Sequence, residues 1–265
     1  MKHILVPVDF SDISMNALKY ALDMFKGKPL AVTLAHFYGT PKGGAFMMKN
    51  IDRILEKEAQ ESMNALIKQM EEAHSEVSFI SKTVQADASS TICDMGNSGK
   101  YDYIIMGTKG ASGLKEVFMG SVAGGVIAGT SAPVMVVPAN YEFKAASEVL
   151  MTIGKEPVVD DSVIEPLIEL LKITGDQLKI LHVVNKSDKV MEVPLGKLKS
   201  LVSEEDYIIG SGDLNKDLNS YIIKDDAQLL CMVRTKKGFF NRIFGGSATL
   251  KQTFNSTIPL LILHE

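Results

Sequence analysis

The sequence predicts an α/β protein made of two tandem units, each with five parallel β-strands covered by helices. Short apolar runs alternate with segments in which apolar residues recur every three or four positions, as in strand–helix–strand crossovers. The apolar runs are almost continuously hydrophobic, which is typical of strands buried on both faces. The same order of elements then occurs a second time within the 265 residues, a length that suits two domains.

The first unit shows its elements clearly. Its first helix is expected to begin after Ser11, a favourable N-cap, and to end before Gly27, a residue suited to a helix stop. The other elements follow from the same apolar patterns. Strands are expected at residues 4–8, 30–37, 77–84, 103–106 and 134–137, and helices at 11–25, 50–73, 90–98 and 121–129.

The second unit repeats this order in a shorter form. Strands at 149–153, 178–184, 229–233 and 260–263 correspond to strands of the first unit, and the missing residues fall mostly where the helix 50–73 stood. The repeat predicts domains at residues 1–140 and 147–265, with 139–147 as the linker.

Composition excludes several classes of function. A net charge of −4 argues against a nucleic-acid partner, which needs a basic face. Cys93 and Cys231 are far apart and have no metal-ligand spacing, so we expect neither a zinc site nor a disulfide scaffold. No apolar run is long enough for a membrane span, and Asp9 comes too early for a signal peptide. The expectation is a cytoplasmic protein without a membrane or nucleic-acid partner.

Three glycines and a serine form the most informative motif of the first unit. Gly107, Gly110, Gly120 and Ser121 lie between a predicted strand and a predicted helix. Glycine permits positive φ angles and close approach of a ligand, and a helix N-terminus offers unpaired amides to an anion. The motif therefore predicts a phosphate cradle at the carboxyl edge of the sheet. The alternative is that these glycines serve only a turn and helix packing.

An aspartate ends the first strand at the same edge. Asp9 follows Pro7 and Val8, and its carboxylate is a suitable acceptor for the amino group of adenine or for ribose hydroxyls. The alternative role of Asp9 is to cap the helix that begins near Ser11.

The segment Val6-Pro-Val-Asp-Phe-Ser-Asp, the strand that carries His36 and the spacing Gly-x2-Gly-x9-Gly-Ser together resemble the universal stress protein family. The resemblance covers nearly the whole chain as two copies. It implies two tandem Rossmann-like domains of the adenine nucleotide alpha hydrolase-like type, paired as an internal pseudo-dimer, with ATP, ADP or AMP as ligand and with or without Mg²⁺. The nucleotide-binding residues that it implies are Pro7, Val8, Asp9, Phe37, Met106, Gly107, Gly110, Gly120, Ser121 and Val122.

The resemblance also implies a role for each of these groups. Asp9 and the backbone before it would line the adenosine site, and the backbone of Phe37 would contact adenine. Met106 and Gly107 would flank the ribose and the α-phosphate. The remaining residues would hold the phosphates through backbone amides and the hydroxyl of Ser121, and Lys109 would add charge without a fixed direction.

The second copy departs from the motif. Asp9 corresponds to Gly154, the first glycine to Val233 and the second to Lys236, although Gly246 and the serine after it are retained. A β-branched side chain at the first glycine position should block the approach of a ligand, so we expect one nucleotide per chain, in the first copy. Arg234, Lys236 and Lys237 would either bind another anion or form a solvated basic turn.

The last strand of each copy is strongly apolar, and the resemblance implies that these edges pair. A tandem chain can satisfy the pairing internally, while a further homodimer stays open.

The function that the sequence favours is a stress-response protein with an adenine nucleotide as regulatory ligand. Two alternatives remain open at this point, a scaffolding module for a non-nucleotide ligand and a slow ATPase. No P-loop and no nucleophile elbow occur, so no catalytic residue is assigned. His36 and His182 are expected to be structural, and no metal ligand is assigned.

Overall fold

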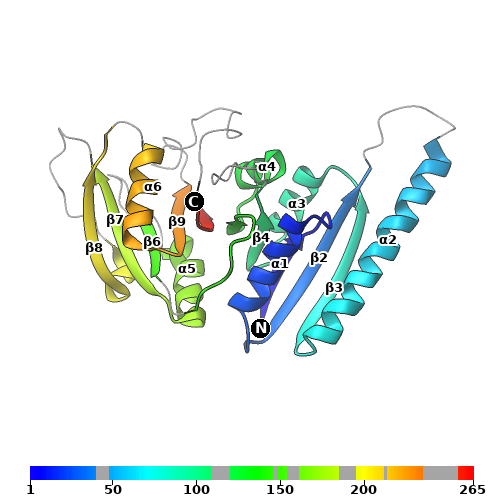
Figure 1. Cartoon of the computed structure of the whole chain (residues 1–265), viewed down its shortest axis with the longest axis horizontal. Helices are drawn as coiled ribbons and strands as arrows, with labels where there is room; N and C mark the ends of the chain where they lie inside the picture. Colours follow the sequence, from blue (N-terminus) through cyan, green and yellow to red (C-terminus); the bar gives the residue numbers. More distant parts are fainter. Residues whose placement is uncertain are drawn as a thin grey trace.

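Ten strands form one continuous sheet in the computed structural model, which describes residues 1–39, 48–108, 120–145, 148–153, 161–184, 195–211, 214–234 and 256–265 (Figure 1). The strands are β1 (Lys2–Pro7), β2 (Leu30–Tyr38), β3 (Val77–Gln85), β4 (Tyr103–Gly107), β5 (Val134–Val137), β6 (Glu148–Ile153), β7 (Gln177–Val184), β8 (Val202–Ile209), β9 (Leu229–Arg234) and β10 (Leu260–His264). The helices are α1 (Asp12–Met24), α2 (Met48–Ala73), α3 (Ala88–Asn97), α4 (Ser121–Gly129), α5 (Asp161–Thr174) and α6 (Leu214–Asp225), with the 3₁₀ helix η1 (Gly196–Ser200).

The sheet consists of two halves with the same strand order. Its order is β3-β2-β1-β4-β5-β10-β9-β6-β7-β8, so each half has its first strand in the middle and its last strand at the centre of the whole sheet. Neighbouring strands within each half are parallel. This is a doubly wound arrangement, in which ligands bind outside the carboxyl ends of the strands next to the first strand. The predicted fold class is confirmed.

The two halves join through their last strands. β5 and β10 are antiparallel, with Leu261 opposite Met135 at the middle of the pairing. Each edge strand therefore covers the other, which removes two open sheet edges from the surface. The internal pairing expected from the sequence is confirmed, and it makes the chain a pseudo-dimer.

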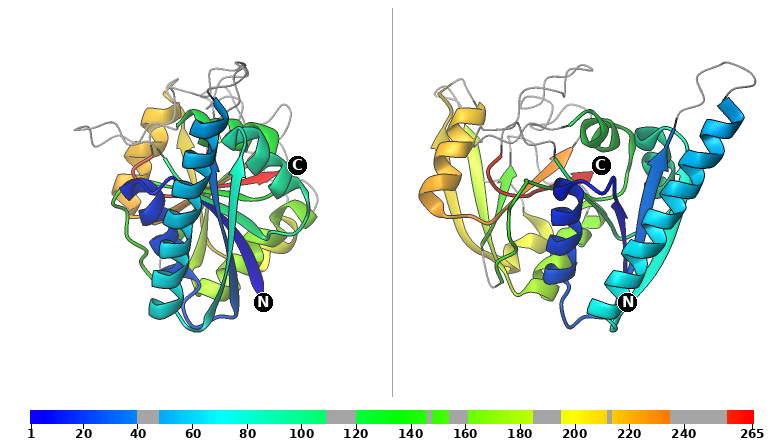
Figure 2. Two further views of the ribbon diagram at one scale, coloured as in Figure 1. Left: turned by 90° about the vertical axis from the view of Figure 1, so that its right-hand side faces the viewer. Right: turned by 45° about the vertical axis from the view of Figure 1, so that its right-hand side comes forward.

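Helices cover both faces of the sheet because side chains alternate along each strand. In β1, Ile4 and Val6 pack on one face, with α1, α2 and α5, whereas Leu5 packs on the other, with α3, α4 and α6. Figure 2 shows the helices on the two sides of the sheet, with the long helix α2 running beside β2 and β3. No helix in the described ranges is long and apolar enough to cross a membrane.

Most predicted elements agree with the structure to within a few residues, and β5 and α4 have the predicted bounds. The sequence analysis did not identify β8, α5 or α6. β7 ends at Val184 and β8 begins at Val202, so the connection has no room for a helix of 26 residues like α2. This agrees with the predicted shortening of the second copy. The domain bounds 1–140 and 147–265 stay a prediction.

Candidate functional site

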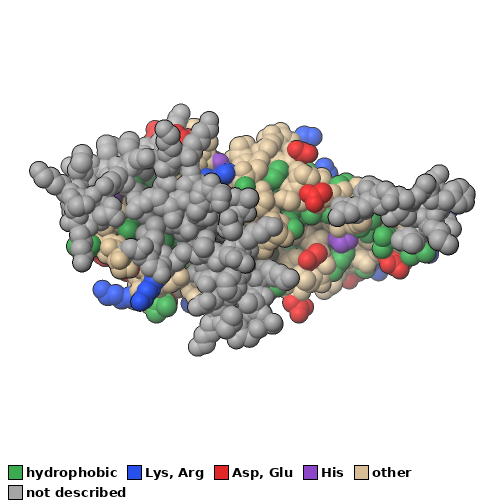
Figure 3. All heavy atoms as spheres, turned by 90° about the horizontal axis from the view of Figure 1, so that it is seen from above, with side chains coloured by type: hydrophobic (Ala, Val, Ile, Leu, Met, Phe, Trp, Pro, Cys, Tyr) green, Lys and Arg blue, Asp and Glu red, His purple; other side chains and the backbone are tan. Residues whose placement is uncertain are grey.

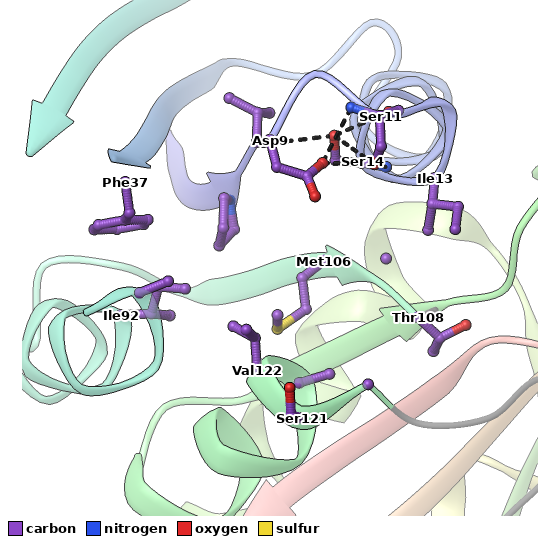
Figure 4. Close-up of a pocket in the computed structure, with 16 residues that line it drawn as sticks. Asp9, Ser11, Ile13, Ser14, Phe37, Ile92, Met106, Thr108, Ser121 and Val122 are labelled. Carbon is purple, nitrogen blue, oxygen red and sulfur yellow. Dashed lines mark hydrogen bonds between the residues drawn. The ribbon is translucent and has the colours of Figure 1, made fainter. Parts of the chain in front are cut away.

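A pocket of about 420 Å³ lies at the carboxyl edge of the first half. It is bounded by the ends of β1 and β4, by the first turn of α4 and by residues of α1 and α3 (Figure 4). Its volume falls within the range of small-molecule sites. It is lined by Pro7, Val8, Asp9, Ser11, Ile13, Ser14, Phe37, Ala88, Ile92, Met106, Gly107, Thr108, Gly120, Ser121, Val122 and Ala123.

The structure brings the predicted site residues together. Every one of them that falls within the described ranges lines this pocket. Gly110 and Lys109 lie outside the described residues. The placement of the others is a structural finding, whereas their contacts with a nucleotide stay a prediction. They are Pro7, Val8, Asp9, Phe37, Met106, Gly107, Gly120, Ser121 and Val122.

Asp9 faces the pocket from the turn between β1 and α1, and it is held there by serines. Its Oδ1 accepts hydrogen bonds from the amide and the hydroxyl of Ser11, at 3.1 and 2.5 Å, and its own amide donates to the hydroxyl of Ser14, at 3.3 Å. Burial alone would raise the pKa of Asp9, but the hydrogen bonds from Ser11 and Ser14 outweigh it and the pKa lies below its ordinary value. Asp9 is therefore an ionised, oriented acceptor at the mouth of the pocket. The N-cap of α1 is Ser11 rather than Asp9, which supports the start of the helix through Ser11, and the contact of Asp9 with an adenosine stays a prediction.

His36 fixes the neighbouring strand end. Its Nδ1 lies 2.8 Å from the carbonyl oxygen of Val8, so the ring donates to the residue that directly follows β1. The ring also packs on Phe10, with centroids 4.6 Å apart, and Phe10 adopts a positive φ of 62° that a non-glycine residue seldom tolerates. His36 thus locks the turn that carries Asp9. This agrees with the structural role expected for it.

Gly107 serves packing rather than a turn. It is the last residue of β4 and is not among the glycines with positive φ. A Cβ on it would lie 2.5 Å from Cγ2 and 2.8 Å from the carbonyl oxygen of Ile13 in α1. The expectation of a positive φ was wrong for Gly107, and also for Gly120, whose φ is −64°. Gly107 is glycine because α1 crosses β4 closely at the floor of the pocket.

The N-terminus of α4 faces the pocket without a capping side chain. Its N-cap is Gly120, and the first backbone bond of the helix joins the amide of Gly124 to the carbonyl of Gly120, at 2.9 Å. The amides of Ser121, Val122 and Ala123 therefore precede the first intrahelical bond. Figure 4 shows the Ser121 side chain at this helix start.

The other two helix starts near the pocket are capped. Ser11 caps α1 by accepting from the amide of Ser14, and Asp87 caps α3 by accepting from the amide of Ser90. α4 is thus the one helix of these three that presents uncapped amides, together with the partial positive charge of its dipole. The arrangement suits an anionic group of a ligand.

The opposite side of the pocket is apolar. In Figure 4 the Phe37 ring and Ile92 lie on one side, and Ser121 and Thr108 lie toward the other. Asp9 is the only ionisable side chain among the described lining residues. Figure 3 looks onto this edge of the molecule, where described acidic side chains are scattered over the surface.

Sequence reasoning missed several lining residues. Ile13, Ala88, Ile92 and Ala123 fit the apolar stripes of their helices, so nothing in the pattern separates them from core residues. Ser14 lies three positions after Ser11, within the predicted helix, and its sequence context gives no sign of a role at the pocket. Thr108 directly follows Gly107, and proximity to the glycine motif is the one signal that could have drawn attention to it.

Most residues that would form the corresponding site of the second half lie outside the described residues. Gly154, Lys236, Lys237, Gly246 and Ser247 are not among the described residues. Arg234 is described, and its Nη1 donates to the carbonyls of Ile127 and Ala128 in α4, each at 2.9 Å. Arg234 ends strand β9 and its guanidinium binds the end of a helix of the first half, so the expectation of a solvated turn was wrong for this residue. The expected anion site stays a prediction, because Lys236 and Lys237 lie outside the described residues.

A family model and a curated protein both match the first half of the chain. The model of the universal stress protein family matches residues 1–138. A universal stress protein of Methanocaldococcus jannaschii is 32% identical over 142 residues, which cover 51% of this chain and 81% of that protein.

Solved structures of the family cover either nearly all of this chain or about half of it. A universal stress protein from Archaeoglobus fulgidus DSM 4304 covers 99% of this chain and 96% of its own at 19% identity, with a TM-score of 0.67, which shows the shared fold of both halves. A universal stress protein family protein from Arabidopsis thaliana, solved with AMP bound, covers 53% of this chain and 93% of its own at 14% identity and a TM-score of 0.39. AMP binding is a property of that plant protein.

Proposed function

Since this chain belongs to the universal stress protein family, we propose that its first half binds an adenine nucleotide, ATP, ADP or AMP, as a regulatory ligand. One observation carries the proposal. The uncapped N-terminus of α4 and the ionised Asp9 face the same pocket, with an apolar side chain cluster between β2 and α3 at its other end.

The apolar end suits the base and ribose. Pro7, Phe37 and Ile92 offer flat and aliphatic surface to an aromatic ring. Asp9, whose lowered pKa keeps it charged, is an acceptor for ribose hydroxyls or an exocyclic amine. An oriented, charged acceptor of this kind favours ligands that carry a matching donor.

The opposite end suits phosphate. The amides of Ser121, Val122 and Ala123 and the hydroxyl of Ser121 are donors to an anion, and the helix dipole favours negative charge there. Any Mg²⁺ would be held mainly by the phosphates and water, since no cluster of three or more potential ligand side chains occurs in the described part of the chain.

Regulation rather than hydrolysis is the function proposed. Among the described lining residues, Asp9 alone has an ionisable side chain, and its lowered pKa makes it a weak base. Nucleotide binding would instead stabilise one arrangement of the pocket walls over another, and partners would respond to that arrangement. The second half, within the proposed bounds 147–265, would bind no nucleotide.

Calorimetric titration tests the proposal. ATP, ADP and AMP are titrated, with and without Mg²⁺, into the full chain, into Asp9→Ala and into Asp12→Ala. Asp12 is an exposed carboxylate in the first turn of α1 that does not line the pocket, so it controls for the loss of one charge. We expect Asp9→Ala to bind about tenfold more weakly and Asp12→Ala to bind like the wild type.

Two results would contradict the proposal. One is the absence of measurable binding of all three nucleotides to the folded wild type. The other is equal affinity of the wild type and Asp9→Ala. Mass spectrometry of the small molecules released from the heat-denatured protein distinguishes the two kinds of ligand. A co-purified molecule that is not a nucleotide would favour the alternative of a scaffolding module.

A further inference from the structure

Two side chains that contact the far end of α4 come from the second half of the chain. Arg234 ends β9 and lies opposite His264 in β10, and both side chains reach the last turn of α4. His264 Nε2 lies 3.0 Å from the carbonyl oxygen of Ile127. The helix that presents amides to the pocket is therefore held at its other end by residues more than one hundred positions away.

The last four carbonyls of α4 are all satisfied, two by each half. The carbonyl of Val126 accepts from the amide of Thr130, at 3.0 Å, and that of Gly129 accepts from the side chain of Asn97, at 3.2 Å. The carbonyls of Ile127 and Ala128 accept from Arg234, and Ile127 also accepts from His264. Without the second half, two carbonyls at the C-terminus of α4 would lose these donors.

α4 has little stability of its own. Its sequence, SVAGGVIAG, is nine residues long and contains three glycines, each of which disfavours a helix by about 1 kcal/mol relative to alanine. A helix this short depends on tertiary contacts. No side chain caps its N-terminus. The guanidinium at its C-terminus both donates hydrogen bonds and complements the helix dipole.

His264 contributes as a neutral donor. Burial lowers the pKa of His264, and the nearby charge of Arg234 lowers it further. The carbonyl oxygen of Ile127 can only accept, so the proton of the neutral ring belongs on Nε2, which donates to it. The contact is therefore retained at neutral pH.

We propose that Arg234 and His264 are positioning residues for the nucleotide site, through which the second half sets the affinity of the first. The inference rests on the proposed nucleotide binding. α4 is a single short helix that buries Val126 and Ile127 in the core, so a shift at its C-terminus would be passed to the amides of its first turn. By linkage, nucleotide binding at one end must strengthen the contacts at the other by the same factor.

A second contact between the halves does not involve α4 and provides a control for the proposed positioning role of Arg234 and His264. The hydroxyl of Tyr103 in β4 donates to the carbonyl of Pro166 in α5, at 2.6 Å. Tyr103 does not line the pocket. Tyr103→Phe removes one bond between the halves and leaves both ends of α4 intact, so it separates positioning of α4 from general loosening of the interface.

The experiment compares Arg234→Met, Arg234→Lys, His264→Phe and Tyr103→Phe in the full chain. ATP affinity is measured by calorimetry, and hydrogen exchange of peptides that cover α4 by mass spectrometry. We expect Arg234→Met to weaken ATP binding at least about fivefold and to speed exchange in α4. Arg234→Lys should recover part of the affinity because it restores a cation at the helix end. Tyr103→Phe should match the wild type in both measurements.

His264→Phe keeps the ring and removes one donor, so it carries the test should Arg234→Met fail to fold. We expect weaker ATP binding and faster α4 exchange in this variant too. Wild-type affinity in the folded Arg234 or His264 variants would overturn the proposal, as would an equal loss in Tyr103→Phe. Absence of ATP binding by the wild type is a different result, because it removes the proposed function and this inference together.

Discussion

Ser11 donates both its amide and its hydroxyl to Asp9 Oδ1 while its hydroxyl oxygen accepts from the amide of Ser14. One serine therefore caps α1 and orients the carboxylate that faces the pocket. The stability of α1 and the orientation of Asp9 therefore both depend on the Ser11 side chain.

Ser11→Ala should lower stability and raise the pKa of Asp9 together. Loss of the N-cap hydroxyl should cost about 1 kcal/mol of the free energy of unfolding. Asp9 loses one of the hydrogen bonds that hold its pKa below the ordinary 3.8. Chemical denaturation measures the first effect, and an NMR titration of the Asp9 carboxyl measures the second.

The pH dependence follows from the same carboxyl. Because the pKa of Asp9 is lower in the folded than in the unfolded chain, its contribution to stability is complete above the ordinary value and disappears as the pH falls through the folded value. Ser11→Ala should reduce this loss in acid, whereas Ser11→Thr, which keeps the hydroxyl, should retain it. An unchanged Asp9 pKa in Ser11→Ala would contradict the prediction.

Gly107→Ala tests whether Gly107 is required for packing. A methyl group at this position would meet the backbone carbonyl of Ile13, so α1 must move away from β4. We expect a loss of about 1–3 kcal/mol in the free energy of unfolding, measured by urea denaturation. Adding Ile13→Ala should recover only part of it, because the carbonyl stays in place. Full recovery in the double variant would show that the side chain alone makes the conflict.

The sequence indicates local elements more reliably than long-range contacts. The bounds of β5 and α4 could be predicted because a buried strand and a glycine-flanked helix have distinctive local patterns. β8 could not, because an edge strand with acidic residues such as Glu204 and Glu205 is half exposed and lacks an apolar run. α5 contains Pro166, which usually ends a helix, and this obscured it.

The same contrast holds at the site. The place of Asp9, Gly107, Gly120 and Ser121 at the pocket could be predicted from strand ends and glycine spacing, since both mark the carboxyl edge of a parallel sheet. Phe37, Met106 and Val122 were implied only by the family resemblance. The roles of Gly107 and Arg234 could not. Each depends on one partner brought close only by the fold, Ile13 for the glycine and the last turn of α4 for the arginine.

Leu261→Ala should destabilise the whole molecule through the joint between its halves. Leu261 is fully buried opposite Met135, where β10 meets β5. We expect a loss of about 2–5 kcal/mol in one cooperative transition, because a single sheet and core run through both halves. Ile209→Ala, at a position that is 63% exposed on β8, should change stability by no more than about 0.5 kcal/mol. Two separate transitions, only one of them shifted by Leu261→Ala, would contradict this expectation.

A cluster of acids around one buried lysine should make the second half sensitive to pH. Lys179 Nζ lies 2.6 Å from Asp225 and 3.2 Å from Glu204. Burial alone would lower the pKa of Lys179, but its hydrogen bonds with Asp225, Tyr221 and Glu204 raise it. Glu148 Oε1 and Asp225 Oδ2 are buried without a donor from any other residue, so the two carboxyl groups share a proton through a hydrogen bond when Glu148 is protonated. Burial, and then the neighbouring Asp225, raise the pKa of Glu148 to about 7.

The expected direction follows from proton binding. Between the ordinary pKa of 4.5 and about 7, the folded chain holds a proton on Glu148 that the unfolded chain has released. The contribution of Glu148 to the free energy of unfolding therefore falls as the pH rises through this range, and it is lost above about pH 7. Glu148→Gln stays neutral, and we expect it to be more stable than the wild type by about 1 kcal/mol at pH 8 and similar near pH 4.5. Thermal unfolding against pH measures the difference. Glu61→Gln is the control, because the Glu61 side chain is 66% exposed on α2 of the first half, and its pH dependence of stability should match that of the wild type.

Gly120→Asp should separate the stability of α4 from its use as an anion site. Gly120 has the extended φ and ψ of −64° and 159° that an N-cap residue adopts, so aspartate fits there without backbone strain. Its carboxylate would accept from the amide of Val122 or Ala123 and would place a negative charge at the pocket. A cap of this kind adds a few tenths of a kcal/mol, at about the level of a glycine-to-aspartate change at other N-caps.

The two measured quantities should therefore move in opposite directions. Unfolding should occur at an equal or higher denaturant concentration, while nucleotide affinity should fall by about tenfold or more, because the phosphate loses its donors and meets a like charge. Gly120→Asn caps the same amides without the charge, so its affinity should lie between those of the wild type and Gly120→Asp. A destabilised Gly120→Asp would mean that the amides of Ser121–Ala123 are not available for capping. Unchanged affinity in a stable Gly120→Asp would mean that the ligand's anionic group binds elsewhere in the pocket.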